Sequence, residues 1–74
     1  MTPYGNSTGG SGVIAYEIHD DAIHIQFKHG PIYVYNDVAP GREHVEEIKR
    51  LALAGQGLST YISKHVRKLF AAKL

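Results

Sequence analysis

The chain has 74 residues and a mass of 8.2 kDa, which allows one small domain. It has no cysteine, so disulfides, thiolate catalysis and sulfur-ligated zinc sites are excluded. No apolar run approaches the roughly 20 residues of a membrane span, and the N-terminus lacks the features of a signal peptide. We therefore expect a soluble cytoplasmic protein with no membrane partner.

The charges divide unevenly along the chain. Residues 1–40 hold one Lys and four acids, whereas residues 41–74 hold seven Lys or Arg and three acids. Residues 59–74 contain no acid at all. An anionic partner is therefore expected to bind the second half of the chain.

Residues 1–12 are rich in Gly, Ser and Thr and offer few side chains to bury. Packing would not compensate the backbone entropy lost if these residues became ordered. We therefore predict a flexible N-terminal tail over residues 1–12 and a folded domain over residues 13–74, beginning near Val13.

Three segments after this tail show the period-two alternation of half-buried strands. They are residues 13–18, 22–28 and 32–35, separated by turns at residues 19–21 and 29–31. Consecutive strands joined by short turns predict a three-stranded antiparallel meander.

The length of the loop at Gly30 leaves two registers open. A two-residue loop places Phe27 opposite Ile32 and puts Tyr33 and Tyr35 on the other face of the sheet. A three-residue loop places Phe27 opposite Tyr33 and puts both tyrosines on the core face. The two tyrosines are therefore either stacking residues for RNA bases or core aromatics, and the second interpretation is favoured.

Two helices are expected after the third strand. Pro40 suits the first turn of an amphipathic helix, and Gly55 suits its left-handed C-cap. Ser59 is a suitable N-cap for a second helix, which we expect to run to about Lys73. The apolar arc of this second helix comprises Leu58, Ile62, Val66, Leu69 and Phe70. The predicted fold is a single α+β domain of order βββαα.

The opposite arc of the second helix carries the main candidate binding residues. Lys64, Arg67 and Lys68 form a basic face that suits a phosphate backbone. His65 and Tyr61 beside it suit hydrogen bonds to phosphate or stacking on an unpaired base. Further candidates on the first helix are Arg42, Lys49 and Arg50. We therefore predict a nucleic-acid surface with a preference for RNA.

Other kinds of site find less support in the sequence. The five histidines show no metal-binding spacing on one helix, and no nucleophile, base or carboxylate pair converges. We expect no metal, no cofactor, no catalytic residue and no enzyme activity. The alternative function is a protein-interaction or oligomerisation module that uses Val13, Ala15 and Val34 on the second face of the sheet. A protein partner or a homo-oligomer thus stays open beside nucleic acid.

Taken together, these segments resemble the KTSC domain, a short module named for the C-terminus of some lysyl-tRNA synthetases and also found as a stand-alone bacterial protein. The resemblance spans residues 14–70. It rests on Ile14-Ala-Tyr16-Glu17, on Ile23-His-Ile25-Gln-Phe27-Lys-His-Gly30, on Tyr33-Val-Tyr35 followed by Val38 and Pro40, and on Ser59-Thr-Tyr61-Ile-Ser-Lys-His-Val66-Arg67.

The resemblance has departures and implications. The family usually has an adjacent Val-Pro pair where this chain has Val38-Ala39-Pro40, and the loop between the helices also differs. The family pattern implies that Tyr33 and Tyr35 share the face of Phe27. The attachment of the family to a tRNA-charging enzyme implies RNA as the partner.

Overall fold

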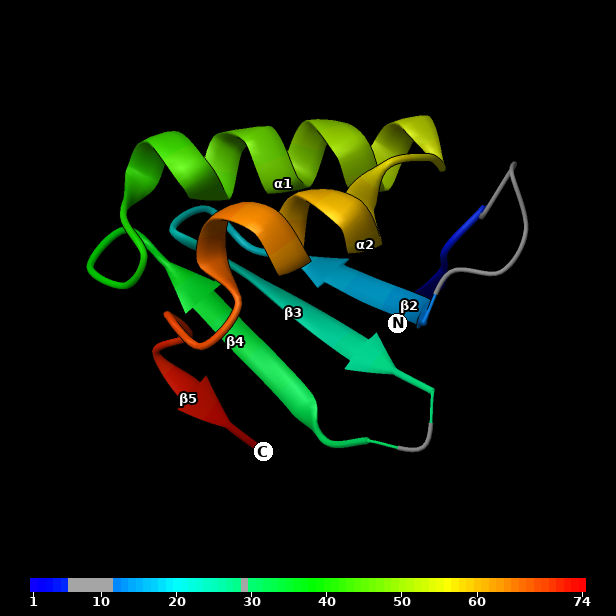
Figure 1. Cartoon of the computed structure of the whole chain (residues 1–74), viewed down its shortest axis with the longest axis horizontal. Helices are drawn as coiled ribbons and strands as arrows, with labels where there is room; N and C mark the ends of the chain where they lie inside the picture. The colour runs from blue at the N-terminus through cyan, green and yellow to red at the C-terminus, as the bar shows by residue number, and fades with distance from the viewer. Residues whose placement is uncertain (6–11, 29) are drawn as a thin grey trace.

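The computed structural model describes residues 1–5, 12–28 and 30–74. Within these residues, five strands form one antiparallel sheet in the order β1-β2-β3-β4-β5, with the helices on one face (Figure 1). The elements are β1 Thr2–Pro3, β2 Val13–Ile18, β3 Ala22–Phe27, β4 Ile32–Asn36, α1 Arg42–Ala54, α2 Leu58–Tyr61, the π-helix η1 Ile62–Val66 and β5 Ala72–Lys73. The α+β class is confirmed, and the predicted order βββαα is corrected by two additional short edge strands.

The three central strands follow the predicted alternation. Tyr16 of β2 pairs with Ile25 of β3, and Ile25 pairs with Tyr33 of β4, so the three side chains share the face under the helices. Both β4 tyrosines lie on this face, as the KTSC resemblance implied. The partner of Tyr33 is nevertheless Ile25 rather than Phe27, because regular pairing ends at Gln26 and Ile32. His29, part of the predicted turn, lies outside the described residues.

A β-bulge in β2 changes the side on which its first residue lies. Val13 pairs with Phe27 while Ala15 pairs with Gln26, so the register shifts by one residue between them. Val13 is consequently buried in the core, and Ile14 is exposed. The prediction that Val13 lies on the second face of the sheet was therefore wrong.

The N-terminal residues belong to the fold. Thr2 pairs with Tyr16 and Pro3 with Ala15, which covers the free edge of β2. Tyr4 is only 7% exposed and packs in the core. Residues 1–5, which the predicted tail included, are therefore packed against the domain through one aromatic side chain and a strand edge. Residues 6–11 of that tail lie outside the described residues.

Helix α1 begins two residues later than Pro40. The carbonyl of Asn36 accepts a hydrogen bond from the Gly41 N–H at 3.1 Å, and Asn36 forms a bridge with Pro40. These contacts hold Pro40 in the connection, so Gly41, with φ 117°, is the N-cap. The C-terminal prediction is confirmed, since Gly55 adopts a left-handed conformation with φ 75°.

The second helical segment is shorter than predicted. Its N-cap is Gly57 rather than Ser59, and it ends at Val66 rather than near Lys73. The Arg67 N–H donates to the Ile62 carbonyl at 2.6 Å and closes the last, wide turn.

The chain then turns back because the edge of β4 offers backbone partners. The Ala71 N–H donates to the Val34 carbonyl at 2.7 Å, and β5 pairs with β4. Phe70 packs on Tyr33 with ring centroids 4.7 Å apart. Leu69, predicted to lie on the apolar arc of a longer helix, is consequently exposed.

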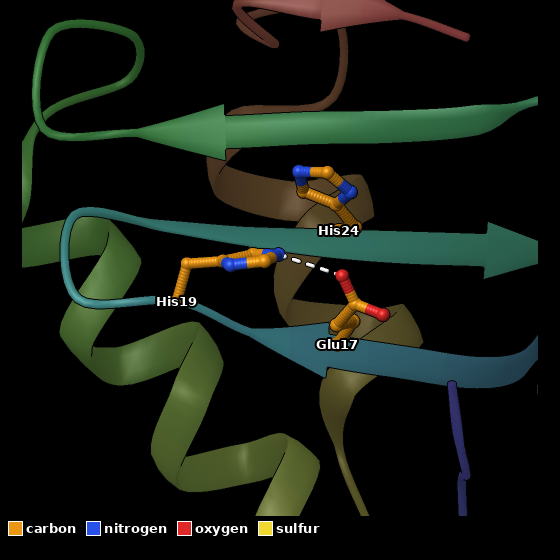
Figure 2. A group of neighbouring side chains, drawn as sticks. All are labelled: Glu17, His19 and His24. Carbon is orange, nitrogen blue, oxygen red and sulfur yellow. Dashed lines mark hydrogen bonds and ion pairs between the residues drawn. The ribbon is translucent and has the colours of Figure 1, made fainter.

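The core fills the space between the sheet and the helices. In Figure 2 the helices lie behind the sheet. The opposite face, here called the open face, carries Ala15, Glu17, His24, Gln26 and Val34, as the pairing register requires. Among the described residues, no helix has the length and apolar character needed to cross a bilayer. The buried core residues are Tyr4, Val13, Tyr16, Ile23, Ile25, Tyr35, Val45, Ile48, Ala52, Leu58, Ile62 and Val66.

Candidate functional site

Lys64, Arg67 and Lys68, here called the basic segment, lie at the end of the second helical region. Ile62 and Val66 of η1 are buried, and they anchor the turn so that the side chains between and after them face solvent. All three cations are exposed, as predicted. They border one open depression of about 400 Å³, whose other lining residues are Ser63, His65, Val66 and Leu69.

The charge of the basic segment is not neutralised locally. In the described part of the chain, the ion pairs are Glu17–His19, Glu46–Lys49 and Glu47–Arg50. No carboxylate of that part lies within 4.0 Å of the three cations, consistent with the absence of acids from residues 59–74. The cations are therefore available to an anionic partner.

The three basic residues of α1 that were predicted to extend the nucleic-acid surface differ from the basic segment in their contacts. The ammonium group of Lys49 donates to the Asp20 carbonyl at 3.0 Å and lies 3.3 Å from Glu46, with the side chain only 13% exposed. Lys49 thus ties α1 to the β2–β3 turn. The guanidinium of Arg50 hydrogen-bonds to Glu47 and lowers the pKa of that carboxyl. Arg42 is exposed at the first position of α1.

A cluster of three rings connects α1 to the basic segment. His44 Nδ1 and the Tyr61 hydroxyl share a hydrogen bond of 2.8 Å. The rings of Tyr61 and His65 are in contact, with centroids 4.5 Å apart and planes tilted by 34°. His44 and Tyr61 are partly buried, whereas His65 is exposed. His65 is therefore the ring of this cluster that solvent reaches most easily.

Acidic residues of α1 influence Tyr61. Partial burial raises the pKa of its hydroxyl, and the negative charges of Glu47 and Glu43 raise it further. A phosphate group is repelled by the same two carboxylates. The favourable region for an anion thus lies at the basic segment rather than over Tyr61.

Tyr35 is a core residue and Tyr33 packs against the core, as the favoured interpretation of the sequence expected, so the alternative of a stacking surface does not hold. Tyr35 is 1% exposed, and burial followed by the charge of Tyr33 raises its pKa to about 12. Its hydroxyl donates to the Arg67 carbonyl at 3.5 Å, which connects β4 to the basic segment. Tyr33 is covered by Phe27, whose ring lies edge-on at 5.2 Å, and by Phe70. Neither tyrosine offers a free face to a base.

The structure brings together three potential metal ligands that the sequence analysis did not group. Figure 2 shows Glu17 of β2, His19 of the following turn and His24 of β3 on the open face. One ligand atom from each lies within 4.8 Å of those of the other two. His19 Nε2 and Glu17 Oε2 are 2.7 Å apart, and the two imidazole centroids are 4.7 Å apart.

The sequence did not reveal these three residues as a group, because metal-binding spacing was expected along one helix. They lie instead on a hairpin, where Glu17 and His24 are cross-strand partners. The turn carries reciprocal hydrogen bonds between the backbones of His19 and Ala22. One signal in the sequence could have shown that two of these residues are neighbours. A two-residue Asp20-Asp21 loop in the predicted meander would place Glu17 opposite His24 on the adjacent strand.

Comparison of the chain with family models, with curated proteins and with solved structures returned no match. The KTSC resemblance therefore rests on the quoted sequence segments alone.

Proposed function

We propose that the chain is a non-enzymatic module that binds single-stranded RNA through the basic segment. The observation that supports this proposal is the convergence of three exposed cations, without a carboxylate nearby in the described residues, around one open depression. Phosphate contacts supply most of the affinity of such modules, because Lys and Arg release the counterions condensed on the nucleic acid.

Three phosphate contacts set the expected strength and salt dependence. Each contact to a single strand contributes about 0.7 to the slope of log affinity against log salt, so Lys64, Arg67 and Lys68 together give a slope of about −2. Affinity should then fall about 20-fold between about 50 and 200 mM salt. A sequence-independent dissociation constant between about 10⁻⁴ and 10⁻⁶ M is expected at physiological salt.

The exposed ring of His65 favours a single strand over a duplex. Unpaired bases can stack on an aromatic side chain, whereas the bases of a duplex are already stacked on one another. His65 lies next to Lys64 in the chain and is supported from below by Tyr61 at 4.5 Å. One base can therefore stack on His65 while its phosphates contact the cations.

The proposal is tested by fluorescence anisotropy with a short labelled oligouridine. Lys68→Glu should weaken binding at low salt and reduce the salt slope by at least about 0.7, the share of one phosphate contact. Lys28→Glu is the matched control, since Lys28 is exposed at the β3–β4 turn and its replacement changes the net charge equally. Equal effects of the two variants, or no effect of Lys68→Glu, would contradict the proposal.

The alternative function, an oligomerisation module, has lost part of its support. Val13 is buried in the core, and Ala15 and Val34 are only partly exposed. They share the open face with Glu17, His24 and Gln26, so the face is mixed rather than apolar. A stable interface between copies normally has a more apolar centre.

A further inference from the structure

We propose that Glu17, His19 and His24 form a binding site for a divalent transition-metal ion such as Zn²⁺ on the open face of the sheet. The inference is independent of the proposed RNA surface, which uses other residues from η1 onward. Its basis is the juxtaposition in Figure 2, where one carboxylate and two imidazoles from a single hairpin meet.

The donor set selects the class of ion. Imidazole nitrogen suits zinc, copper and nickel, whereas magnesium and calcium prefer sites built of oxygen ligands alone. Two histidines and one glutamate are a known ligand set for zinc, with a fourth position taken by water. The side chains of Glu17 and His19 are 46% and 44% exposed, so solvent reaches the cluster and can complete the coordination.

The geometry requires only small side-chain movements. Ligand bonds of about 2.0–2.2 Å around a tetrahedral ion place the donor atoms about 3.3 Å apart. The three donors already lie within 4.8 Å of one another, and the closest pair, His19 Nε2 and Glu17 Oε2, is at 2.7 Å. Metal binding would replace this hydrogen bond: the His19 ring would carry its proton on Nδ1, which frees the Nε2 lone pair, and the two donor atoms would separate slightly around the ion.

The backbone holds the three ligands in position before binding. Glu17 and His24 are paired across β2 and β3, and Ile18 pairs with Ile23 next to them. The His19 N–H donates to the Ala22 carbonyl at 2.8 Å, which closes the turn. A site on such a hairpin loses little backbone entropy when the ion binds.

The local charge also favours a cation. The hairpin of residues 13–27 contains three acids, Glu17, Asp20 and Asp21, and no Lys or Arg, and Lys49, which reaches its turn from α1, is paired with Glu46. The summed potential of the three acids attracts a divalent ion toward this end of the sheet. The contrast with the cationic segment 59–74 means that the two proposed surfaces attract ligands of opposite charge.

The test is a titration of the full chain with ZnCl₂ in a non-chelating buffer, followed by the histidine ring signals in NMR spectra and by calorimetry. We expect one saturable equivalent of Zn²⁺, with the largest changes at the rings of His19 and His24. MgCl₂ at the same concentrations should produce no such change.

Ligand variants and a control variant make the test specific. His19→Asn, His24→Asn and Glu17→Gln should each weaken Zn²⁺ binding at least about tenfold, because loss of a direct ligand should cost no less than the about 10–100-fold typical of losing a partner that only orients a ligand. His65→Asn is the matched control, because it removes an exposed histidine outside the cluster. His19 lies in an exposed turn, so His19→Asn should keep the amide spectrum of the fold even where His24→Asn does not.

Three outcomes would overturn the proposal. The first is the absence of saturable Zn²⁺ binding, and the second is a response spread over all histidines, which would mean an adventitious ion only. The third is tight binding that survives in the His19→Asn/His24→Asn double variant. RNA binding by this double variant should be unchanged, so the metal site and the RNA surface can fail separately.

Discussion

The hydroxyl of Tyr4 accepts a hydrogen bond from the backbone N–H of Leu58 at 3.2 Å, and so connects the N-terminus to the first turn of α2. Leu58 is fully buried, and its N–H is one of the groups at a helix start that have no partner within the helix. Tyr4 thus supplies a hydrogen-bond partner to the start of α2 from outside the helix, whereas the N-cap position that the sequence analysis had assigned to Ser59 is held by Gly57. The start of α2, which leads to the basic segment, is thus held in part by a residue 54 positions away.

Tyr4→Phe should lower the free energy of unfolding by about 1–3 kcal/mol, because the buried N–H of Leu58 would lose its partner. Urea unfolding measures this as a lower midpoint with an unchanged slope. Ser59→Ala, which removes the predicted cap, should change stability by no more than about 0.5 kcal/mol. A larger loss in Ser59→Ala than in Tyr4→Phe would contradict this role of the Tyr4 hydroxyl.

Gly57→Ala should destabilise the protein by about 1–2 kcal/mol, because Gly57 has φ 78° and a Cβ is disfavoured in this left-handed conformation. A Cβ there would meet Leu51 at 3.6 Å, an ordinary contact, so the loss comes from the backbone rather than from a clash. Thermal unfolding should show a decrease of about 4–8 °C per kcal/mol. Gly57→Asn should recover part of the loss, and an alanine variant as stable as the natural chain would contradict this interpretation.

Removal of residues 71–74 should destabilise the sheet and cause association between copies. The deletion removes the β4–β5 pairing and with it backbone hydrogen bonds that include Ala71 N–H to Val34 O, Leu74 N–H to Ile32 O and Ile32 N–H to Leu74 O. Each contributes about 0.5–1.5 kcal/mol, and the uncovered edge of β4 becomes available to another chain. Sedimentation at several concentrations tests this, with Lys73→Ala as a variant that keeps the strand. A truncated chain whose mass does not rise with concentration would argue against edge protection by β5.

Tyr35 should make the stability of the protein depend on pH in the alkaline range. Burial raises its pKa from 10.0 to about 12, so the fold favours the neutral phenol. Because the pKa is raised in the folded protein, the contribution of Tyr35 to the free energy of unfolding is complete below pH 10 and is lost as the pH rises from 10 toward 12. Urea midpoints across this window should fall less steeply for Tyr35→Phe than for the natural chain. Tyr61, whose pKa is also raised, contributes in the same direction, so the urea midpoint of Tyr35→Phe should still fall somewhat with pH. Identical slopes of midpoint against pH for the variant and the natural chain would exclude the role of Tyr35.

The central elements were predictable because their side chains repeat with the period of the structure. The strand over residues 13–18 has its predicted bounds, and α1 places Val45, Ile48 and Ala52 in the core as the helical spacing required. β1 and β5 were missed, because two-residue edge strands have no period and form only where a neighbouring strand offers a partner.

The residues of the candidate sites were likewise predictable only where a repeating sequence pattern determines their exposure. The exposure of Lys64 followed from helical spacing, since Ile62 and Val66 face the core, whereas Arg67 and Lys68 are exposed in the turn that follows Val66. The roles of Lys49 and Tyr35 did not follow from such spacing, because a contact with Asp20 or with Arg67 depends on tertiary packing.

The central claim is that the basic segment binds single-stranded RNA, and residue-resolved amide shifts test it most directly. Labelled protein would be titrated with single-stranded RNA, with tRNA and with duplex DNA at about 50 and 200 mM salt. We predict that shifts cluster on residues 63–69 and that the affinity for single-stranded RNA exceeds that for duplex DNA and falls about 20-fold with salt. The absence of shifts at the lower salt concentration, or shifts centred on the open face instead, would contradict the account.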